Sequence, residues 1–221
     1  MGEKITLTAS DGVTIGAYKA VPAGTPRGGV VVIQEIFGIN PHIQAVADGY
    51  AAEGYLAIAP ALFDRLEPGI ELGYTGADWD KAIDLMNRTD KEKALLDIEA
   101  AVAAASAGGK VGIVGFCFGG LMTFISAARV PGLSAAVAYY GGGIADVADL
   151  KPKVPLMLHF GERDEWIPPS AIEKIRAAQP QAQIYLYPTG HAFNRAGYPP
   201  YDEASATLAK SRTLAFFADH L

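Results

Sequence analysis

The stretch from Lys110 to Gly120, KVGIVGFCFGG, constrains the fold more than any other part of the chain. An apolar, β-branched run leads into Gly115, Cys117 and Gly119, which form the pattern GxCxG. This pattern is typical of a nucleophile elbow, in which a strand reverses sharply into a helix and presents one side chain at the tip. The residues two before and two after the tip pass so close to their neighbours that a Cβ atom would collide. The sequence therefore predicts a strand, a tight turn and a helix here.

Cys117 is the candidate nucleophile at the tip of this turn, and it is the single cysteine of the chain. The apolar helix expected from Leu121 onwards points its N-terminus at the sulfur, which favours the thiolate over the thiol. The alternative is a small hydrophobic residue in the core, a common role for a free cysteine. A core residue needs neither the flanking glycines nor the reversal of the chain, so we favour the nucleophile.

The composition restricts the class of protein and its partners. The chain has 221 residues, of which 50% are hydrophobic, so it can bury the core of one domain. A single cysteine excludes an internal disulfide and a CxxC metal or redox pair. The net charge is -6 and no cluster of Lys and Arg with interleaved aromatic residues occurs, so we expect no nucleic-acid partner. The chain lacks signal-peptide features and membrane-length apolar runs, so we expect a cytoplasmic protein without a membrane partner.

The hydrophobic pattern predicts an α/β fold. Two alternating runs flank Ser10-Asp11-Gly12 and predict an N-terminal antiparallel hairpin. Short apolar runs then alternate with helical patterns, which indicates a mostly parallel central sheet with helices on both faces. The expected later strands, besides the strand of the elbow, cover residues 30–34, 55–59, 135–140, 154–160 and 183–187. The expected helices cover residues 40–54, 170–178 and 202–221, and a further helix starts at 89 and ends at Gly108 and Gly109.

Two further features complete the expected organisation. Residues 62–88 contain a proline, several glycines and one weak helical patch around 79–86, so we expect an excursion over the edge of the sheet. Residues 89–92, TDKE, read as a capping box at the start of the next helix. Because there is no internal repeat, low-complexity tract or linker, we expect a single domain over residues 1–221.

A cysteine nucleophile needs a base, and the base needs an orienting group. In an open α/β sheet these groups come from loops at the carboxyl ends of strands. Asp164 and His191 follow two expected strands in such loops, in the order nucleophile, acid, histidine. Asp164 could alternatively cap a turn, and His191 could be an ordinary loop histidine. We expect structural roles for the other three histidines. His42 lies in the first turn of an expected helix, His159 within an expected strand and His220 at the end of the sequence.

The loop after the strand 30–34 supplies further candidates. The backbone N–H of Ile36, with that of Phe118 just after the nucleophile, would form an oxyanion hole. Glu35 is a carboxylate in an apolar loop, which is costly unless it is paired. Its alternative is a surface glutamate at the end of a strand. Arg195 could bind an anionic substrate, although a solvated arginine of a loop is the alternative.

Four motifs together resemble the dienelactone hydrolase family of α/β-hydrolases: Gln34–Gly38 (QEIFG), Gly115–Gly120 (GFCFGG), Gly161–Asp164 (GERD) and Gly190–Phe193 (GHAF). They occur in order across nearly the whole chain. The resemblance implies a Cys117, Asp164, His191 triad with Glu35 near the thiol, which would take the thiol proton when substrate binds. It also implies a small cyclic enol-lactone substrate bearing a carboxylate, as opened by a carboxymethylenebutenolidase.

One departure from the family pattern leaves the identity of the substrate undetermined. The resemblance implies two arginines that grip the substrate carboxylate, and Arg195 stands where one of them belongs. Arg65 and Arg88 are the candidates for the other, in poorly matching context. A broad-specificity small-molecule esterase and a catalytically silent ligand-binding relative are the alternatives. We expect no cofactor and no metal, and a monomer, with a weak dimer as the alternative.

Overall fold

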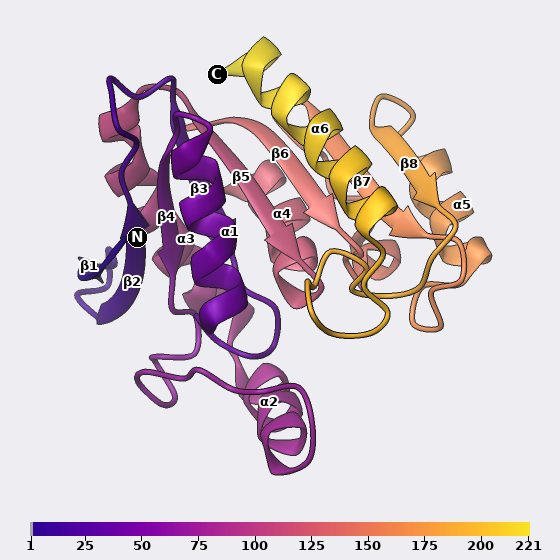
Figure 1. Ribbon diagram of the computed structural model, residues 1–221, viewed down its shortest axis with the longest axis horizontal. Helices are drawn as coiled ribbons and strands as arrows, with labels where there is room; N and C mark the ends of the chain where they lie inside the picture. The colour runs from indigo at the N-terminus through magenta and orange to yellow at the C-terminus, as the bar shows by residue number, and fades with distance from the viewer. Residues whose placement is uncertain (1) are drawn as a thin grey trace.

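A single mixed sheet forms the centre of the protein in this computed structural model, which describes residues 2–221. Its strand order is β1-β2-β4-β3-β5-β6-β7-β8 (Figure 1). The strands are β1 (Glu3–Thr8), β2 (Thr14–Ala20), β3 (Gly29–Ile33), β4 (Leu56–Pro60), β5 (Val111–Phe116), β6 (Leu133–Tyr139), β7 (Leu156–Gly161) and β8 (Gln183–Tyr187). β3, β4 and β5 are buried along their whole length, as expected for strands covered on both faces.

The direction of the strands changes near the N-terminal edge. β1 and β2 form the predicted antiparallel hairpin, with Leu7 opposite Ile15. β2 also pairs antiparallel with β4, whereas all pairs from β4 through β8 are parallel. The predicted mostly parallel sheet with an antiparallel N-terminal hairpin is therefore confirmed.

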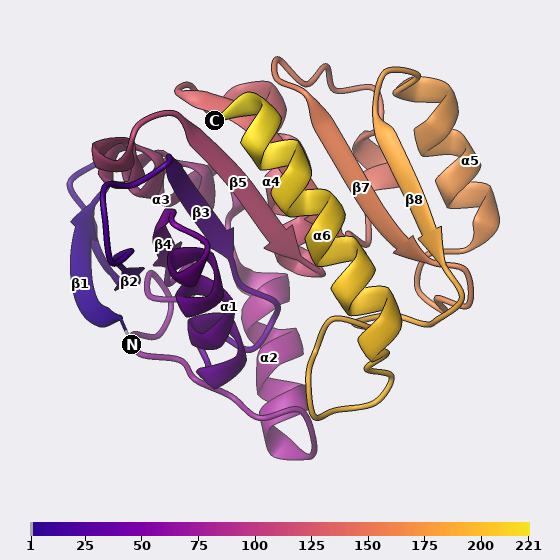
Figure 2. The same ribbon diagram turned by 45° about the horizontal axis from the view of Figure 1, so that its top comes forward.

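Helices cover both faces of the sheet. α1 and α6 lie on one face, and α3, α4 and α5 on the other (Figures 1 and 2). The helices are α1 (Pro41–Ala52), α2 (Ala77–Arg88), α3 (Lys91–Ala105), α4 (Phe118–Arg129), α5 (Pro169–Ala178) and α6 (Glu203–His220). None of the helices in the described part of the chain is long and apolar enough to cross a membrane.

Side-chain caps fix the starts of α1 and α3. The Asn40 side chain accepts a hydrogen bond from the backbone N–H of Ile43. The expected capping box at 89–92 is wrong in its register, because Asp90 is the N-cap of α3 and accepts from the N–H groups of Glu92 and Lys93. Thr89 instead donates its hydroxyl to a carbonyl at the end of α2, since the two helices follow each other without a loop.

The excursion over residues 62–88 lies at the carboxyl edge of the parallel strands (Figure 1). It contains α2, which is longer than the weak patch in the sequence suggested. The excursion is tied to the loop after β3 by backbone hydrogen bonds from Leu72 N to Phe37 O (2.9 Å) and from Ile39 N to Ile70 O (3.2 Å). α2 is thereby held next to the loops that follow β3 and β5.

Candidate active site

Cys117 lies between β5 and α4 in a strained backbone conformation. Its φ is 54°, a left-handed value that is rare for a residue with a side chain. Cβ atoms on Gly115 and Gly119 would collide with the carbonyl oxygens of Gly119 and Gln34 respectively. The glycines therefore permit the sharp reversal that the sequence predicted, and they leave the half-buried thiol at the N-terminus of α4.

His191 and Asp164 form a hydrogen-bonded pair beside this thiol. Nδ1 of His191 lies 2.7 Å from Oδ2 of Asp164, and the side chains are 17% and 0% exposed. The other oxygen of Asp164 accepts from the backbone N–H groups of Trp166 (2.9 Å) and Ile167 (3.2 Å). Asp164 thus caps a turn and holds the imidazole at the same time.

The charge state of His191 depends on its two partners. Burial works against the charged ring, but hydrogen bonds to Asp164 and Cys117, and the charges of those groups, raise the pKa of His191 to about 10. The ordinary value is 6.5. The imidazole is therefore protonated at neutral pH while it faces the sulfur.

Two backbone amides are free to bind an oxyanion. Within residues 2–221, neither Ile36 nor Phe118 donates its N–H to a protein acceptor, the latter because it is the first residue of α4. Both residues line the same cavity as Cys117. The loop that carries Ile36 is fixed by the buried Gln34 side chain, which accepts from the N–H of Leu62 (3.0 Å) and donates to Glu35 O (3.3 Å). These are the features of a preorganised oxyanion hole.

Glu35 is buried and paired with Arg195. Its side chain is 1% exposed, and its two oxygens accept from Nε (3.0 Å) and Nη2 (3.1 Å) of Arg195. The guanidinium also lies over the rings of Tyr74 (4.4 Å) and Phe37 (5.1 Å). A bidentate, stacked ion pair therefore offsets the free-energy cost of burying this carboxylate, and Glu35 is not a surface residue.

Arg195 lines the Cys117 cavity, as expected for a residue that meets substrate, although two of its three nitrogens already bond Glu35. The other candidate arginines lie elsewhere. Arg65 is held by Asp97 (2.8 Å) and Asp11 (2.9 Å), and Arg88 pairs with Asp84 (2.7 Å) on the exposed side of α2. Neither lines the cavity of Cys117.

Tyr140 is a site residue that the sequence did not reveal. It follows β6, is fully buried, and has a left-handed φ of 37°. Its ring centroid lies 5.1 Å from that of His191, and its hydroxyl lies 3.4 Å from Oε1 of Glu35. Tyr140 therefore joins the two pairs. The glycine run at 141–143 was the available signal, because it marks the carboxyl end of a strand next to the elbow.

The three other histidines lie outside the cavity. His159 is buried between the hydroxyls of Tyr187 (2.8 Å) and Thr213 (3.1 Å), and burial lowers its pKa to about 3. Nδ1 of His220 lies 2.7 Å from the carbonyl oxygen of Phe216 in its own helix. Burial also lowers the pKa of His42. His159 is therefore neutral and hydrogen-bonded, which is consistent with the structural role expected from the sequence.

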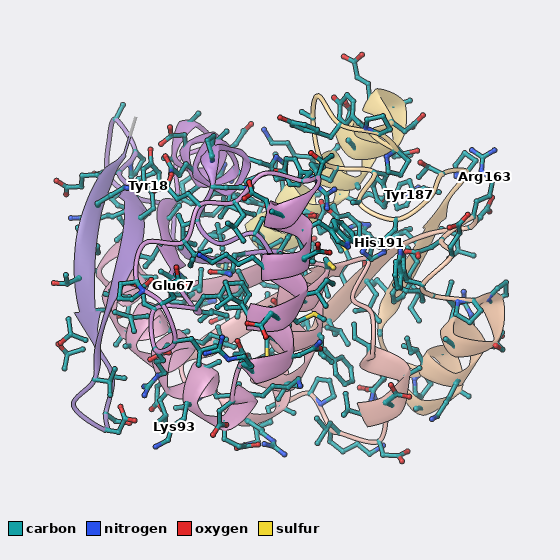
Figure 3. The ribbon with its side chains drawn as sticks, turned by 90° about the horizontal axis from the view of Figure 1, so that it is seen from below. Tyr18, Glu67, Lys93, Arg163, Tyr187 and His191 are labelled. Carbon is teal, nitrogen blue, oxygen red and sulfur yellow. The ribbon has the colours of Figure 1, made fainter. Side chains whose placement is uncertain are left out.

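The cavity over the thiol has a volume of about 430 Å³. It lies at the carboxyl edge of the sheet, under α2, with His191 beside that helix (Figure 3). The cavity brings together Cys117, His191, Ile36, Phe118 and Arg195, which the sequence had predicted as site residues. Glu35 and Asp164 lie behind Arg195 and His191, one step removed from the cavity.

Comparison with known proteins agrees with this arrangement. A match to the dienelactone hydrolase family spans residues 15–221. Carboxymethylenebutenolidase from Pseudomonas putida is 34% identical over 227 residues, which cover 98% of this chain and 96% of that protein. Carboxymethylenebutenolidase 1 from Cupriavidus pinatubonensis is 31% identical over 228 residues, which cover 99% and 97%.

Solved structures show the same fold. The crystal structure of a Klebsiella pneumoniae protein assigned to the dienelactone hydrolases has a TM-score of 0.85 at 30% identity, with 100% of both chains covered. An esterase from Pyrococcus furiosus has a TM-score of 0.73 at 16% identity, with 100% of this chain and 93% of that one covered, which is a likeness of fold alone. The chain therefore belongs to the dienelactone hydrolase family, a family of hydrolases with the α/β-hydrolase fold.

Proposed function

We propose that this protein is a carboxylic ester hydrolase that opens small lactones or cleaves small esters, with Cys117 as the nucleophile. The carboxymethylenebutenolidases among its relatives make lactone opening the first activity to test. One observation carries the proposal. Cys117 shares a cavity with His191, and the imidazole is held by Asp164 at 2.7 Å on its far side. A nucleophile, a base and an orienting group are the minimum set for acyl transfer.

In the acylation step, the Cys117 sulfur attacks the carbonyl carbon, and the carbonyl π electrons move onto the oxygen. The N–H groups of Ile36 and Phe118 stabilise this oxyanion. When the C–O bond breaks, protonated His191 gives its proton to the leaving alkoxide. The products are a thioester on Cys117 and an alcohol, which stays attached to the acyl group when the substrate is a lactone.

The same histidine serves as base in deacylation. Its raised pKa depends partly on the hydrogen bond to Cys117 and on the charge of that group. Thioester formation removes that negative charge, so the pKa of His191 falls and the neutral ring can accept a proton from water. Hydroxide attack on the thioester then releases the acid and restores the sulfur. Asp164 orients the ring in both steps.

Glu35 is assigned to the thiol on the family resemblance. Both of its oxygens bond Arg195, so the carboxylate can reach Cys117 only after this pair opens. A substrate carboxylate that binds Arg195 would compete with Glu35 for the guanidinium and would release it. Glu35 would then take the thiol proton in the complex. On this proposal Glu35→Gln slows acylation and leaves deacylation unchanged, which pre-steady-state kinetics can separate.

Hydrolysis of p-nitrophenyl acetate and of a carboxylate-bearing enol-lactone by the purified protein tests the proposal. The expected result is multiple turnover with both substrates, and total loss after stoichiometric alkylation of Cys117. In His191→Ala, deacylation should stall and leave a thioacyl adduct visible by intact mass. Undiminished turnover of Cys117→Ala, or no turnover of either substrate by the native protein, would reject covalent hydrolysis by this cysteine.

A further inference from the structure

α2 carries two apolar stripes, which are buried to different degrees. Ala82 and Leu85 are 0% and 1% exposed, so they pack against the body of the protein. Trp79, Ile83 and Met86 lie at helical spacing on a neighbouring stripe, are only half-buried, and line the Cys117 cavity. These three side chains pack only partly against the core, with the Trp79 ring centroid 5.7 Å from that of Phe37, and their remaining surface faces the cavity. The second stripe therefore provides apolar surface to the cavity.

The charges in the cavity favour a neutral group beside this stripe. Among the residues that line the cavity, Arg195 and Lys91 are the cations besides the protonated His191, which faces the sulfur. The Arg195 guanidinium is occupied by Glu35 and by the rings of Tyr74 and Phe37. Lys91 is an exposed residue at the start of α3. The stripe itself carries no charge, so an anionic group placed against it would lose its hydration without gaining a partner.

The direction of attack decides which part of the substrate meets α2. In the tetrahedral intermediate, carbon is bonded to the sulfur, the oxyanion, the leaving oxygen and the acyl chain. The oxyanion points to Ile36 and Phe118, and the leaving oxygen must face His191 to receive its proton. Trp166, which is 69% exposed, lines the cavity two residues after Asp164 and so extends this leaving-group side. The acyl chain takes a remaining direction, and Trp79, Ile83 and Met86 of α2 offer it three large apolar side chains among the residues that line the cavity.

We propose that Trp79, Ile83 and Met86 form an acyl-binding wall and make this hydrolase selective for esters with a neutral, apolar acyl chain of medium length. The inference rests on the proposed hydrolase function and specifies its substrate class. Each methylene buried against the wall should raise kcat/KM about fourfold, the partition gain of one CH₂ group. The cavity of about 430 Å³ limits this gain, so the rise should end at some chain length.

The test uses p-nitrophenyl acetate, butyrate, hexanoate and octanoate, which share one leaving group. kcat/KM of the native protein should rise from acetate to hexanoate. In the double variant Ile83→Ala/Met86→Ala, the hexanoate-to-acetate ratio should fall by about tenfold, since most of the wall is lost. Asp80→Ala, on the outer side of α2, is the matched control and should keep the native ratio. If the double variant does not fold, Met86→Ala alone should lower the ratio by a smaller factor.

The outcomes separate this inference from the proposed function. Absence of acetate hydrolysis by the native protein would reject the hydrolase and the acyl wall together. Acetate hydrolysis with a flat response to chain length would reject the wall alone. p-Nitrophenyl hemiglutarate is the charged counterpart in the series. A preference for it over the neutral butyrate that disappears in Lys91→Met would overturn the inference, because the wall would then serve a carboxylate.

Discussion

Two buried acid–base pairs adjoin the cavity of Cys117, and Tyr140 lies between them. In the first, a single hydrogen bond of 2.7 Å joins Asp164 to His191, whose side chain is 17% exposed and faces the cavity. In the second, two hydrogen bonds and two aromatic rings hold Arg195 on Glu35, and both side chains are nearly inaccessible. Both pairs place a carboxylate behind a cation.

The difference lies in what each cation can do. Imidazole can lose and regain a proton, and the pKa of His191 depends on the charge of Cys117, so the first pair can move protons. Guanidinium stays charged at all relevant pH values, so the second pair can only hold charge, exchange its partner or keep the loop in place. In the first pair the cation can therefore transfer a proton, whereas in the second pair it can only exchange its partner or support the loop.

The largest expected effect is the loss of the thiol itself. Cys117→Ala should reduce ester hydrolysis to the uncatalysed rate, because no covalent acyl intermediate can form without the sulfur. The fold should remain, since Gly115 and Gly119 set the backbone of the elbow. Steady-state kinetics and thermal unfolding check the two parts. Cys117→Ser should keep a small fraction of the activity, and full activity in the serine form would contradict a site tuned for sulfur.

Breaking the first pair is expected to cost almost as much. Asp164→Asn keeps the size of the side chain but favours the wrong tautomer of His191, which costs on the order of ten-thousand-fold in kcat in the serine-protease precedent. Glu165→Gln is the matched control and should retain the native rate, because Glu165 is exposed and lies next to Asp164 in the chain. An unchanged rate in Asp164→Asn would move the acid role to another residue.

Breaking the second pair should affect substrates unequally. Arg195→Ala should weaken turnover of a carboxylate-bearing lactone by roughly 1.5 to 3 kcal/mol, the usual worth of a hydrogen bond to a charged group. A neutral aryl ester should lose much less. The variant should also lose about 3 to 5 kcal/mol of unfolding free energy, because Glu35 is left buried without a partner. Equal losses with both substrates would show that Arg195 has only its structural role.

The pH dependence should come from the first pair alone. The single-turnover acylation rate should fall above pH 10, by about tenfold per pH unit, as His191 loses the proton that the leaving group needs. Because the folded pKa is raised from 6.5 to about 10, the charged ring stabilises the fold fully below pH 6.5, and this contribution is lost as pH rises toward 10. NMR titration of His191 should give a lower pKa in Cys117→Ala, and an unchanged pKa would refute the coupling to sulfur.

The smallest effect is expected at Arg88, which does not line the cavity. Arg88 lies on the exposed side of α2 and pairs with Asp84 over a single helical turn, where ion pairs are worth about 0.3 to 0.5 kcal/mol. Arg88→Ala should therefore leave kcat/KM for a carboxylate-bearing lactone unchanged. A loss comparable to that of Arg195→Ala would show that α2 turns toward the substrate during catalysis.

Sequence reasoning went furthest where one local rule fixes the structure. The GxCxG pattern predicted the elbow because a Cβ at Gly115 or Gly119 has no room in any such reversal. The same reasoning was less accurate at 89–92, where Thr89 and Asp90 both suit an N-cap. Which of them caps α3 depends on where α2 ends, and short-range propensity does not determine that point.

The sequence did not predict which residues far apart in the chain pair with each other. Glu35 was recognised as a carboxylate that needs a partner, and Arg195 as a free cation for substrate, yet the two residues bond each other over 160 positions of chain. Tyr140 gave no signal of its own, because a tyrosine at the end of an apolar strand is common. Only the placement of β3 and β6 on either side of β5 brings Glu35 and Tyr140 together.

The sequence by itself determined the alternation of strands and helices, the elbow with its single cysteine, and the chain order of nucleophile, acid and histidine. These depend on local sterics and on hydrophobic periodicity, which short segments contain in full. The tertiary structure alone decided that Arg195 is held by Glu35, that Arg65 and Arg88 lie away from the thiol, and that α2 presents a second apolar stripe to the cavity. Those outcomes depend on distances between segments far apart in the chain, and such distances are fixed only when the sheet is assembled and the loops at its carboxyl edge pack together.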